Sequence, residues 1–257
     1  MKSEIQKFFI GDIEDDEETL TKYSHDASLF EVRPKLVVFP KNETDVENLV
    51  QWVNDNKIKF PELSLTARSA GTCMSGGPLN ESIIMDFTRF MNRIKKIERV
   101  NPFTITPLFP GAKPVTIVGK AVVEPGCFYR DFETETLKLN LLLPCFTASK
   151  SINAVGGMVG NNSGGELTLR YGKTEDYVAS LRTVLSDGHT YELGPESRRE
   201  LYSKIAQVDI EGQIHKKLFD LIENNRSLID AARPNVTKNS AGYYMWNICL
   251  LYTSPSP

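Results

Sequence analysis

Short apolar runs separated by turn residues dominate the pattern of hydrophobic and polar positions along this chain of 257 residues. Continuous apolar runs over 36–40 and 82–87 predict buried strands, and a proline closes the first of them. Alternating positions over 63–66 predict a third, short strand. Further strands are expected over 94–100, 115–118, 121–126, 177–185 and 190–193, with a hairpin turn at 186–189.

Helical periodicity appears between these runs. Apolar residues of 44–56 share one helical face, and Thr44 forms a capping box with Glu47 that predicts the first turn. Amphipathic helices are also expected over 128–141, 197–206 and 210–229. Strands and helices mix without a regular βαβ alternation, which indicates an α+β fold with short strands.

Composition and charge are those of an ordinary globular protein. Hydrophobic residues make up 40% and charged residues 25%, and the formal net charge of -3 leaves no basic footprint for nucleic acid. No apolar stretch approaches the length of a transmembrane helix and the N-terminus lacks a signal-peptide core, so we expect a cytoplasmic location. The four cysteines and three histidines have neither metal-ligand nor disulfide spacing, so we expect free thiols and no metal site.

Charged residues are distributed unevenly. The polar N-terminal segment, 1–22, contains an acidic run over 12–18, and we expect it to be helical or loosely ordered and solvated. A basic run over 89–99 is expected to form a solvated edge rather than a binding patch.

Glycine and small polar residues are concentrated in two segments. The first glycine segment, 66–77, reads Thr-Ala-Arg-Ser-Ala-Gly-Thr-Cys-Met-Ser-Gly-Gly. Such a loop can turn several backbone N–H groups towards one anion, with hydroxyl groups beside them and Arg68 as a fixed positive charge. A diphosphate cradle and an ordinary turn between strands are equally good interpretations of this loop alone. The chain has no P-loop motif and no G-x-G-x-x-G that opens a helix, which disfavours P-loop and Rossmann nucleotide sites.

The second glycine segment, 144–172, has Gly-Gly-Met-Val-Gly-Asn-Asn-Ser-Gly-Gly at its centre, 156–165. Five glycines in these ten residues argue against a helix, and Asn161 and Asn162 tolerate left-handed backbone while offering amide groups. A long mobile surface loop is one interpretation. We favour a buried segment whose backbone approaches a flat ligand, because apolar residues are interspersed at Ile152, Val155, Met158 and Val159.

With both segments in place, the chain resembles the FAD-binding domain of PCMH-type flavoenzymes of the vanillyl-alcohol oxidase group. The branch it resembles most is that of the glycolate oxidase D-subunit and D-lactate dehydrogenase. The resemblance spans about 23–244 and rests on ordered motifs: Tyr23-Ser24-x-Asp26-Ala27, Val37-Val38-Phe39-Pro40, Arg68-Ser69-Ala70-Gly71-Thr72-x-x-Ser75-Gly76-Gly77, Val123-Glu124-Pro125-Gly126, the stretch 152–165, Tyr171-Gly172-x-Thr174-x-Asp176 and Thr237-Lys238-Asn239-Ser240-Ala241-Gly242-Tyr243.

The resemblance implies a PCMH-type FAD-binding domain over 23–232, made of two α+β subdomains at about 23–94 and 100–232 with FAD between them. The first glycine segment would hold the diphosphate, the second would approach the flavin ring or its ribityl chain, and Val178 would help to hold the adenine. The implied cofactor-binding residues are Pro40, Arg68, Ser69, Ala70, Gly71, Thr72, Cys73, Ser75, Gly76, Gly77, Pro125, Gly126, Pro144, Ser149, Gly156, Gly157, Asn161, Asn162, Gly164, Gly172 and Val178.

Three positions depart from the family pattern. Ser69 stands where the family loop usually has glycine, so the backbone there must not need angles that only glycine adopts. Thr72 stands where some relatives attach flavin to a histidine, and we therefore expect non-covalent FAD. Cys145 lies near the expected flavin, where a small buried hydrophobe is a better interpretation than a reactive thiol.

The implied activity is that of a flavin-dependent oxidoreductase that oxidises a 2-hydroxy acid of the D-lactate or glycolate type by hydride transfer to the flavin. We expect residues 233–248 to begin a substrate domain and 249–257 to be a non-native tail that resembles translated adaptor sequence, so that the chain is a fragment. The catalytic residues would then lie outside the chain, and the electron acceptor is not indicated. Peripheral membrane association of the full protein stays possible.

Two alternatives remain open. One is another PCMH-type flavoenzyme, such as a reductase resembling the one that acts on enolpyruvyl-UDP-GlcNAc. The Asn161-to-Gly165 run and Thr237-Lys238-Asn239 favour the hydroxy-acid branch over it. The other is a non-catalytic FAD-binding module that serves a larger complex.

Overall fold

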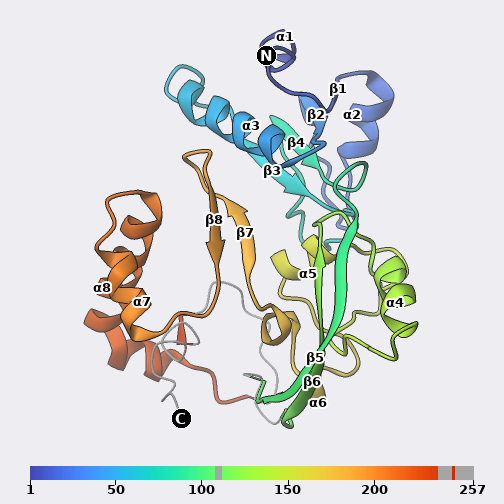
Figure 1. Cartoon of the computed structure of the whole chain (residues 1–257). Helices are drawn as coiled ribbons and strands as arrows, with labels where there is room; N and C mark the ends of the chain where they lie inside the picture. Colours follow the sequence, from blue (N-terminus) through green and yellow to red (C-terminus); the bar gives the residue numbers. More distant parts are fainter. Residues whose placement is uncertain (108–111, 237–244, 247–257) are drawn as a thin grey trace. The chain divides into compact units, whose positions relative to one another are not determined.

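The computed structural model describes residues 1–107, 112–236 and 245–246 (Figure 1). It divides into two compact units, the first made of Met1–Tyr177 with Ser186–His189 and the second of Val178–Leu185 with Thr190–Pro257. The motif over 237–243 and the expected tail over 249–257 lie outside the described residues. The predicted domain and subdomain boundaries stay predictions.

A four-stranded sheet lies in the N-terminal part of the first unit, in the order β1 (Asp12–Glu14), β2 (Leu36–Phe39), β4 (Ile83–Asp86), β3 (Leu65–Arg68) (Figure 1). β2, β4 and β3 run parallel, and β1 pairs antiparallel with β2. All residues of β2 and β4 are buried, as expected for central parallel strands with continuous apolar runs. Both predicted buried strands are therefore confirmed, while β3 lies slightly later than the predicted 63–66.

Helix α3 (Glu43–Asn56) connects β2 to β3, but it does not begin at the predicted capping box. Its N-cap is Asn42, whose Oδ1 accepts a hydrogen bond from the Asp45 N–H over 3.0 Å. The buried Asp45 carboxylate accepts three more backbone hydrogen bonds, from Ile10, Gly11 and Lys41. The prediction of Thr44 as N-cap is wrong. Asparagine caps a helix as well as threonine does, and a start at Asn42 places the Asp45 carboxylate within reach of the Ile10 and Gly11 N–H groups.

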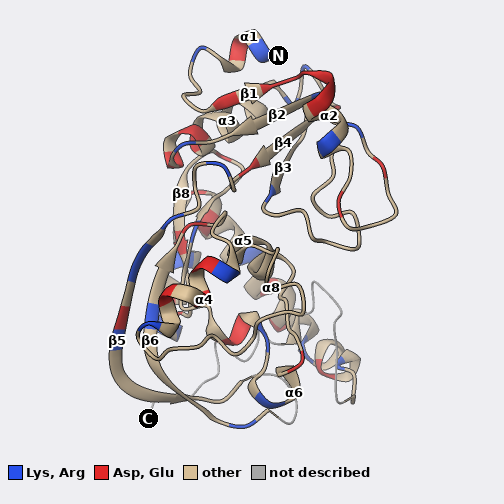
Figure 2. Ribbon diagram, turned by 90° about the vertical axis from the view of Figure 1, so that its right-hand side faces the viewer, with Lys and Arg blue, Asp and Glu red and all other residues tan. Residues whose placement is uncertain are grey.

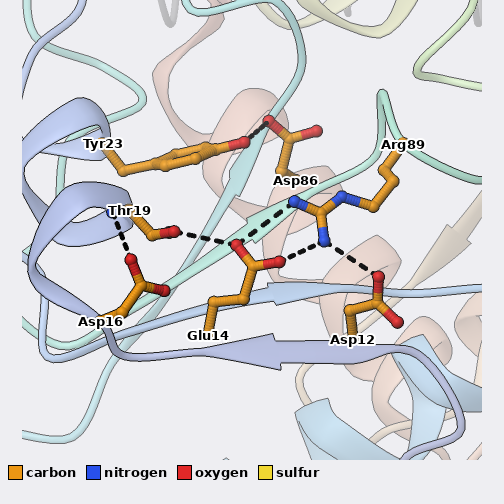
Figure 3. Close-up of polar contacts among 7 residues, drawn as sticks. All are labelled: Asp12, Glu14, Asp16, Thr19, Tyr23, Asp86 and Arg89. Atoms are coloured by element: carbon orange, nitrogen blue, oxygen red, sulfur yellow. Dashed lines mark hydrogen bonds and ion pairs between the residues drawn. The ribbon is translucent and has the colours of Figure 1, made fainter.

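The first part of the acidic N-terminal run is built into the fold, whereas residues 15–18 are exposed. It supplies the edge strand β1, which stands between the short helices α1 (Lys2–Ile5) and α2 (Glu17–Tyr23). Arg89 donates hydrogen bonds to Asp12, over 2.9 Å, and to Glu14 (Figure 3). The Arg89 hydrogen bond holds the pKa of the Glu14 carboxyl below its usual value. The expectation of solvated runs therefore fails at Asp12, Glu14 and Arg89, which pair with one another. It holds for residues 15–18 and for the basic residues at 93, 95, 96 and 99, which are exposed.

A long antiparallel hairpin of β5 (Ile94–Ile105) and β6 (Val115–Val123) follows in the first unit. The charged residues of β5 lie in its first half, at Lys95, Lys96, Glu98 and Arg99 (Figure 2). Helix α4 (Tyr129–Leu137) then ends before the predicted 141. Its end is closed by Asn140 in the left-handed conformation (φ 52°) and by the Leu141 N–H, which donates to the Thr136 carbonyl.

The second glycine segment contains a helix that the sequence argued against. The centre of this segment begins with α5 (Val155–Gly160), and α6 (Thr168–Tyr171) and a 3₁₀ turn (Thr174–Tyr177) follow. Tertiary hydrogen bonds from its first N–H groups hold α5 in place despite its low helix propensity. Met158 is buried in a cluster with Cys127, Tyr129, Phe132 and Cys145, whereas Ile152 is exposed, so the predicted burial holds only in part.

The second unit consists of the hairpin β7 (Leu181–Val184) and β8 (Thr190–Leu193) with helices α7 (Arg198–Ile205) and α8 (Ile210–Ala232). The predicted hairpin is confirmed, but its first strand begins at Leu181 rather than at Tyr177, which ends the 3₁₀ turn. α8 confirms the helix predicted over 210–229, and it buries Ile222 and Ile229 while Leu221 is about half exposed. No helix among the described residues is long and apolar enough to cross a membrane.

Candidate functional site

After the carboxyl end of β3, the first glycine segment forms a loop whose backbone conformation depends on glycine. Gly71 and Gly76 have φ angles of 67° and 78°, which L-residues with side chains rarely adopt. A Cβ atom on Gly71 would also lie 2.4 Å from Nη2 of Arg68. Ser69 is not among the non-glycine residues with positive φ. Its backbone therefore does not need angles that only glycine adopts, as the serine at this position requires.

The Arg68 side chain lies directly beside the backbone of this loop at Gly71. Its Nη2 donates to the His25 carbonyl over 2.8 Å, and its guanidinium carbon lies 4.9 Å from the centre of the Tyr23 ring. Burial lowers the pKa of Arg68, and the pKa of Tyr23 is raised by burial and by Asp86, to which its hydroxyl donates over 3.0 Å (Figure 3). The arginine therefore brings positive charge to the loop while its hydrogen bonds go to protein carbonyls.

Backbone donors of the loop are available for a ligand. Within the described part of the chain, the N–H groups of Ala70, Gly71 and Thr72 donate no hydrogen bond. All three residues are half-buried. Because unpaired, partly buried N–H groups are costly unless a ligand or water binds them, this run suits an anion such as a diphosphate.

The carbonyl of Pro125 joins the two glycine segments. It accepts a hydrogen bond from Ser69 Oγ over 3.1 Å and another from the Gly156 N–H over 2.8 Å. A Cβ atom on Gly156 would lie 2.7 Å from this carbonyl oxygen and 2.9 Å from Ser69 Oγ, so only glycine allows the approach. Further along, Cys73 Sγ lies 4.0 Å from Oδ1 of Asn161. The structure thus brings the two segments together, as the buried-ligand interpretation requires.

The turn around Pro125 is held from its other side by a buried carboxylate. Glu124 is 4% exposed, and its carboxylate accepts hydrogen bonds from the Arg93 backbone N–H over 2.9 Å and from the Arg93 guanidinium. Burial raises the pKa of Glu124, but the hydrogen bonds from Arg93 outweigh this and hold the pKa below its usual value. Gly126 lies against the Phe87 carbonyl, which a Cβ atom would approach to 2.1 Å. The sequence did not reveal the Glu124–Arg93 pair, because nothing local connects residues so far apart.

In the second glycine segment, internal hydrogen bonds hold several of the predicted residues. Asn162 has a φ of 44°, as its residue type allows, and its Oδ1 accepts from the Glu175 N–H over 3.0 Å. Gly164 packs against Thr168, whose Oγ1 a Cβ atom would meet at 2.4 Å. Gly172 has a φ of 82° beside Asp176. These residues shape the segment, and their contact with a ligand stays a prediction.

The remaining predicted residues differ in their surroundings. Cys145 is fully buried, and burial raises the pKa of its thiol to about 11, which fits a small hydrophobe rather than a reactive group. Ser149 Oγ lies 2.9 Å from Thr147 Oγ1, which also accepts from the amide of Asn153. Pro40 is buried directly after β2, Pro144 and Gly157 are half-buried, and Gly77 is exposed. Val178 belongs to the second unit, and its proposed adenine contact stays a prediction.

A metal centre is not evident. Among the described residues, no group of three or more histidine, cysteine, aspartate or glutamate side chains could hold a metal ion. Of the four cysteines, the three that the structure describes are free thiols, and Cys249 lies outside the described residues.

Comparison with known families identifies the class. The model of a family described as an FAD binding domain matches residues 34–194, which is more than half of the chain. The chain therefore belongs to this FAD binding domain family, and the resemblance, the α+β fold and the FAD cofactor expected from the sequence are confirmed.

Curated relatives include proteins named for the oxidation of hydroxy acids. A D-2-hydroxyglutarate dehydrogenase from Pantoea ananatis is 28% identical over 236 residues, a match that covers 91% of this chain and 21% of that enzyme. The glycolate oxidase subunit GlcD from Bacillus subtilis is 26% identical over 182 residues, covering 70% of this chain and 34% of that subunit. The chain thus spans about a fifth to a third of the length of these relatives.

Solved structures show the same fold. An alkyldihydroxyacetonephosphate synthase superposes with a TM-score of 0.59 and 21% identity, over 83% of this chain and 36% of that one. The 6-hydroxy-D-nicotine oxidase from Arthrobacter nicotinovorans gives a TM-score of 0.55 and 21% identity, over 76% of this chain and 38% of that chain. The residues of this chain fit FAD, because the loop of free N–H groups can take a diphosphate and a glycine-rich helix lies beside it.

Proposed function

We propose that this chain is the FAD-binding part of a flavin-dependent oxidoreductase that oxidises a 2-hydroxy acid. One observation carries the site assignment: the Pro125 carbonyl binds both Ser69 and Gly156, and so places the loop of free N–H groups beside α5. The curated relatives carry the substrate class, since one is named a D-2-hydroxyglutarate dehydrogenase and the other a glycolate oxidase subunit.

In this proposal the first glycine segment binds the FAD diphosphate. The N–H groups of Ala70, Gly71 and Thr72 donate to phosphate oxygens, and the Arg68 guanidinium offsets part of the negative charge. The second glycine segment offers backbone and apolar surface to the flavin ring. Bound FAD supplies the hydride acceptor, and the protein supplies its position and the exclusion of water.

We further propose that FAD is held without a covalent bond, because Thr72 offers no nitrogen for attachment. Acid precipitation of the loaded protein is then expected to leave all flavin in the supernatant. A cytoplasmic location and a 2-hydroxy acid as the partner substrate are also part of the proposal. The proposal names no electron acceptor.

The proposal is tested by titrating the purified 257-residue chain with FAD and following flavin fluorescence, with ATP and NAD as competitors. We expect saturable binding of FAD and at least about tenfold weaker binding of the two competitors, because neither carries an isoalloxazine ring for the second glycine segment. Anaerobic addition of D-2-hydroxyglutarate, D-lactate or glycolate to a longer protein that contains this chain is expected to bleach the flavin. Binding of ATP as tightly as FAD would contradict the flavin assignment.

A further inference from the structure

Among the described residues, the Pro125 carbonyl is the one group that accepts hydrogen bonds from both Ser69 and Gly156. Its oxygen has two lone pairs, and both are used: one by Ser69 Oγ at 3.1 Å and one by the Gly156 N–H at 2.8 Å. Gly156 belongs to the first turn of α5, and Ser69 is the residue directly before the free N–H groups of the first glycine segment. A single oxygen atom therefore holds Ser69 and Gly156 next to each other.

This oxygen sits on a turn that cannot move freely. The residue before it, Glu124, is bound through its carboxylate to Arg93 and through its backbone N–H to the Arg93 carbonyl, over 2.9 Å. The residue after it, Gly126, donates its N–H to the Met91 carbonyl over 2.8 Å and is packed tightly against Phe87. The turn is thus fixed to the chain that follows β4, so the Pro125 carbonyl is a rigid acceptor.

We propose that Ser69 is a positioning residue of the FAD site, acting through the Pro125 carbonyl rather than by contact with FAD. Its hydroxyl proton is directed to that carbonyl, so it does not serve as a donor to a diphosphate. The hydrogen bond holds the start of the first glycine segment against the turn that also holds α5. This inference rests on the proposed FAD function.

A positioning role has a kinetic consequence that a direct contact lacks. If the bond keeps the free loop in its binding conformation, its loss lowers the fraction of the free protein that is competent to bind. The association rate constant then falls by that fraction. The dissociation rate constant changes little, because bound FAD itself orders the loop.

The experiment compares Ser69→Ala with Ser64→Ala in the full chain, by stopped-flow measurement of FAD association and dissociation. Ser64 is a matched control, since it is a half-buried serine at the other end of β3, with its hydroxyl bonded to Asn80 over 3.0 Å. We expect Ser69→Ala to lower the association rate constant about three- to tenfold, as the loss of one hydrogen bond allows. We expect the dissociation rate constant of Ser69→Ala to stay within about twofold of the wild-type value. We expect Ser64→Ala to leave both rate constants within about twofold of the wild-type values.

Urea unfolding of the apo variants separates positioning from general damage. Both variants are expected to shift the midpoint by similar amounts, because each loses one part-buried hydroxyl bond. An equal effect of both variants on association, or an effect of Ser69→Ala confined to dissociation, would overturn the inference while the FAD function stands. Failure of the wild-type chain to bind FAD would overturn the proposed function and the inference with it.

Discussion

Glu124 shows how one buried charge can hold a functional turn. Its carboxylate is almost fully enclosed, yet Arg93 is largely exposed, so the pair combines a buried acceptor with a donor that keeps its contact with water. Removal of the Arg93 side chain would leave this carboxylate buried with fewer partners, whereas removal of the carboxylate would leave an arginine that water can solvate. At the scale of single residues, the position of the Pro125 carbonyl depends on this glutamate.

We expect Glu124→Gln to lower the free energy of unfolding by about 1–2 kcal/mol at pH 7, because charged hydrogen bonds are replaced by neutral ones. The folded-state pKa of Glu124 lies below the ordinary value of 4.5. The carboxylate therefore contributes fully to the free energy of unfolding above pH about 4.5, and this contribution is lost as the pH falls through the folded-state pKa. Urea denaturation at a series of pH values measures this. The difference from wild type should shrink below pH about 4.5. Exposed Glu62→Gln serves as the control, and a difference that persists unchanged in acid would contradict the assignment.

Cysteine reactivity is also decided at the residue scale. Cys127 and Cys145 are buried, and burial raises the pKa of each thiol to about 11. At Cys73 burial acts in the same direction, but hydrogen bonds led by Ser75 outweigh it and lower the pKa. We expect a thiol reagent at pH 7 to modify Cys73 first among the three described cysteines, and added FAD to slow that reaction. Mass spectrometry of tryptic peptides gives the order, and earlier labelling of Cys145 would contradict it.

At the scale of elements, helix starts are set by the fold as much as by the sequence motif. α3 begins from Asn42, although Thr44 and Glu47 have the spacing of a capping box. Asp45, at the third position of the helix, bonds to the Asn42 side chain and to the chain before β1 at the same time. The helix therefore starts where the Asp45 N–H can donate to Asn42 while its buried carboxylate accepts from the chain before β1.

This difference can be measured with two exposed side chains. Asn42→Ala is expected to lower the free energy of unfolding by about 1 kcal/mol, whereas Thr44→Ala should change it by less than about 0.5 kcal/mol. Thermal or urea unfolding of the two variants provides the comparison. A larger loss for Thr44→Ala would restore the capping box predicted from the sequence.

Elements with a strong local pattern could be predicted, and those that depend on distant partners could not. The continuous apolar runs of β2 and β4, the hairpin of β7 and β8, and α8 follow from residues next to one another in the chain. β1 is acidic and short, and it becomes a strand only because β2 offers an edge and Arg89 pairs its charges. Helix α5 forms in a glycine-rich stretch because the Cys127 and Pro125 carbonyls accept its first N–H groups.

The same distinction holds for the candidate site. The composition of the first glycine segment allowed a diphosphate cradle or an ordinary turn, and that of the second favoured a ligand. The resemblance to a flavoenzyme family then indicated FAD as the ligand. Their junction at the Pro125 carbonyl and the Glu124–Arg93 pair could not be predicted, because each joins residues more than thirty positions apart. Whether the predicted residues touch FAD stays a prediction.

At the scale of the whole molecule, the chain belongs to an FAD binding domain family and spans about a fifth to a third of the length of the curated relatives described above. The family model covers most of the first unit and extends to residue 194, and the curated relatives are three to five times longer than their matched parts. FAD binds only the folded chain in this account, so saturating FAD should raise the resistance of the chain to unfolding. The central claim is that the first glycine segment is the diphosphate cradle.

An FAD titration of Gly71→Ala beside Gly188→Ala tests that claim most directly. The two glycines are matched, with φ angles of 67° and 79° and with Cβ positions 2.4 Å and 2.7 Å from the nearest side-chain atom. Each substitution costs about 1–2 kcal/mol in backbone strain, but only Gly71 lies in the predicted cradle. We predict that Gly71→Ala weakens FAD binding at least about tenfold and that Gly188→Ala changes it less than about twofold. Equal effects of the two substitutions, or unchanged binding in Gly71→Ala, would contradict the account.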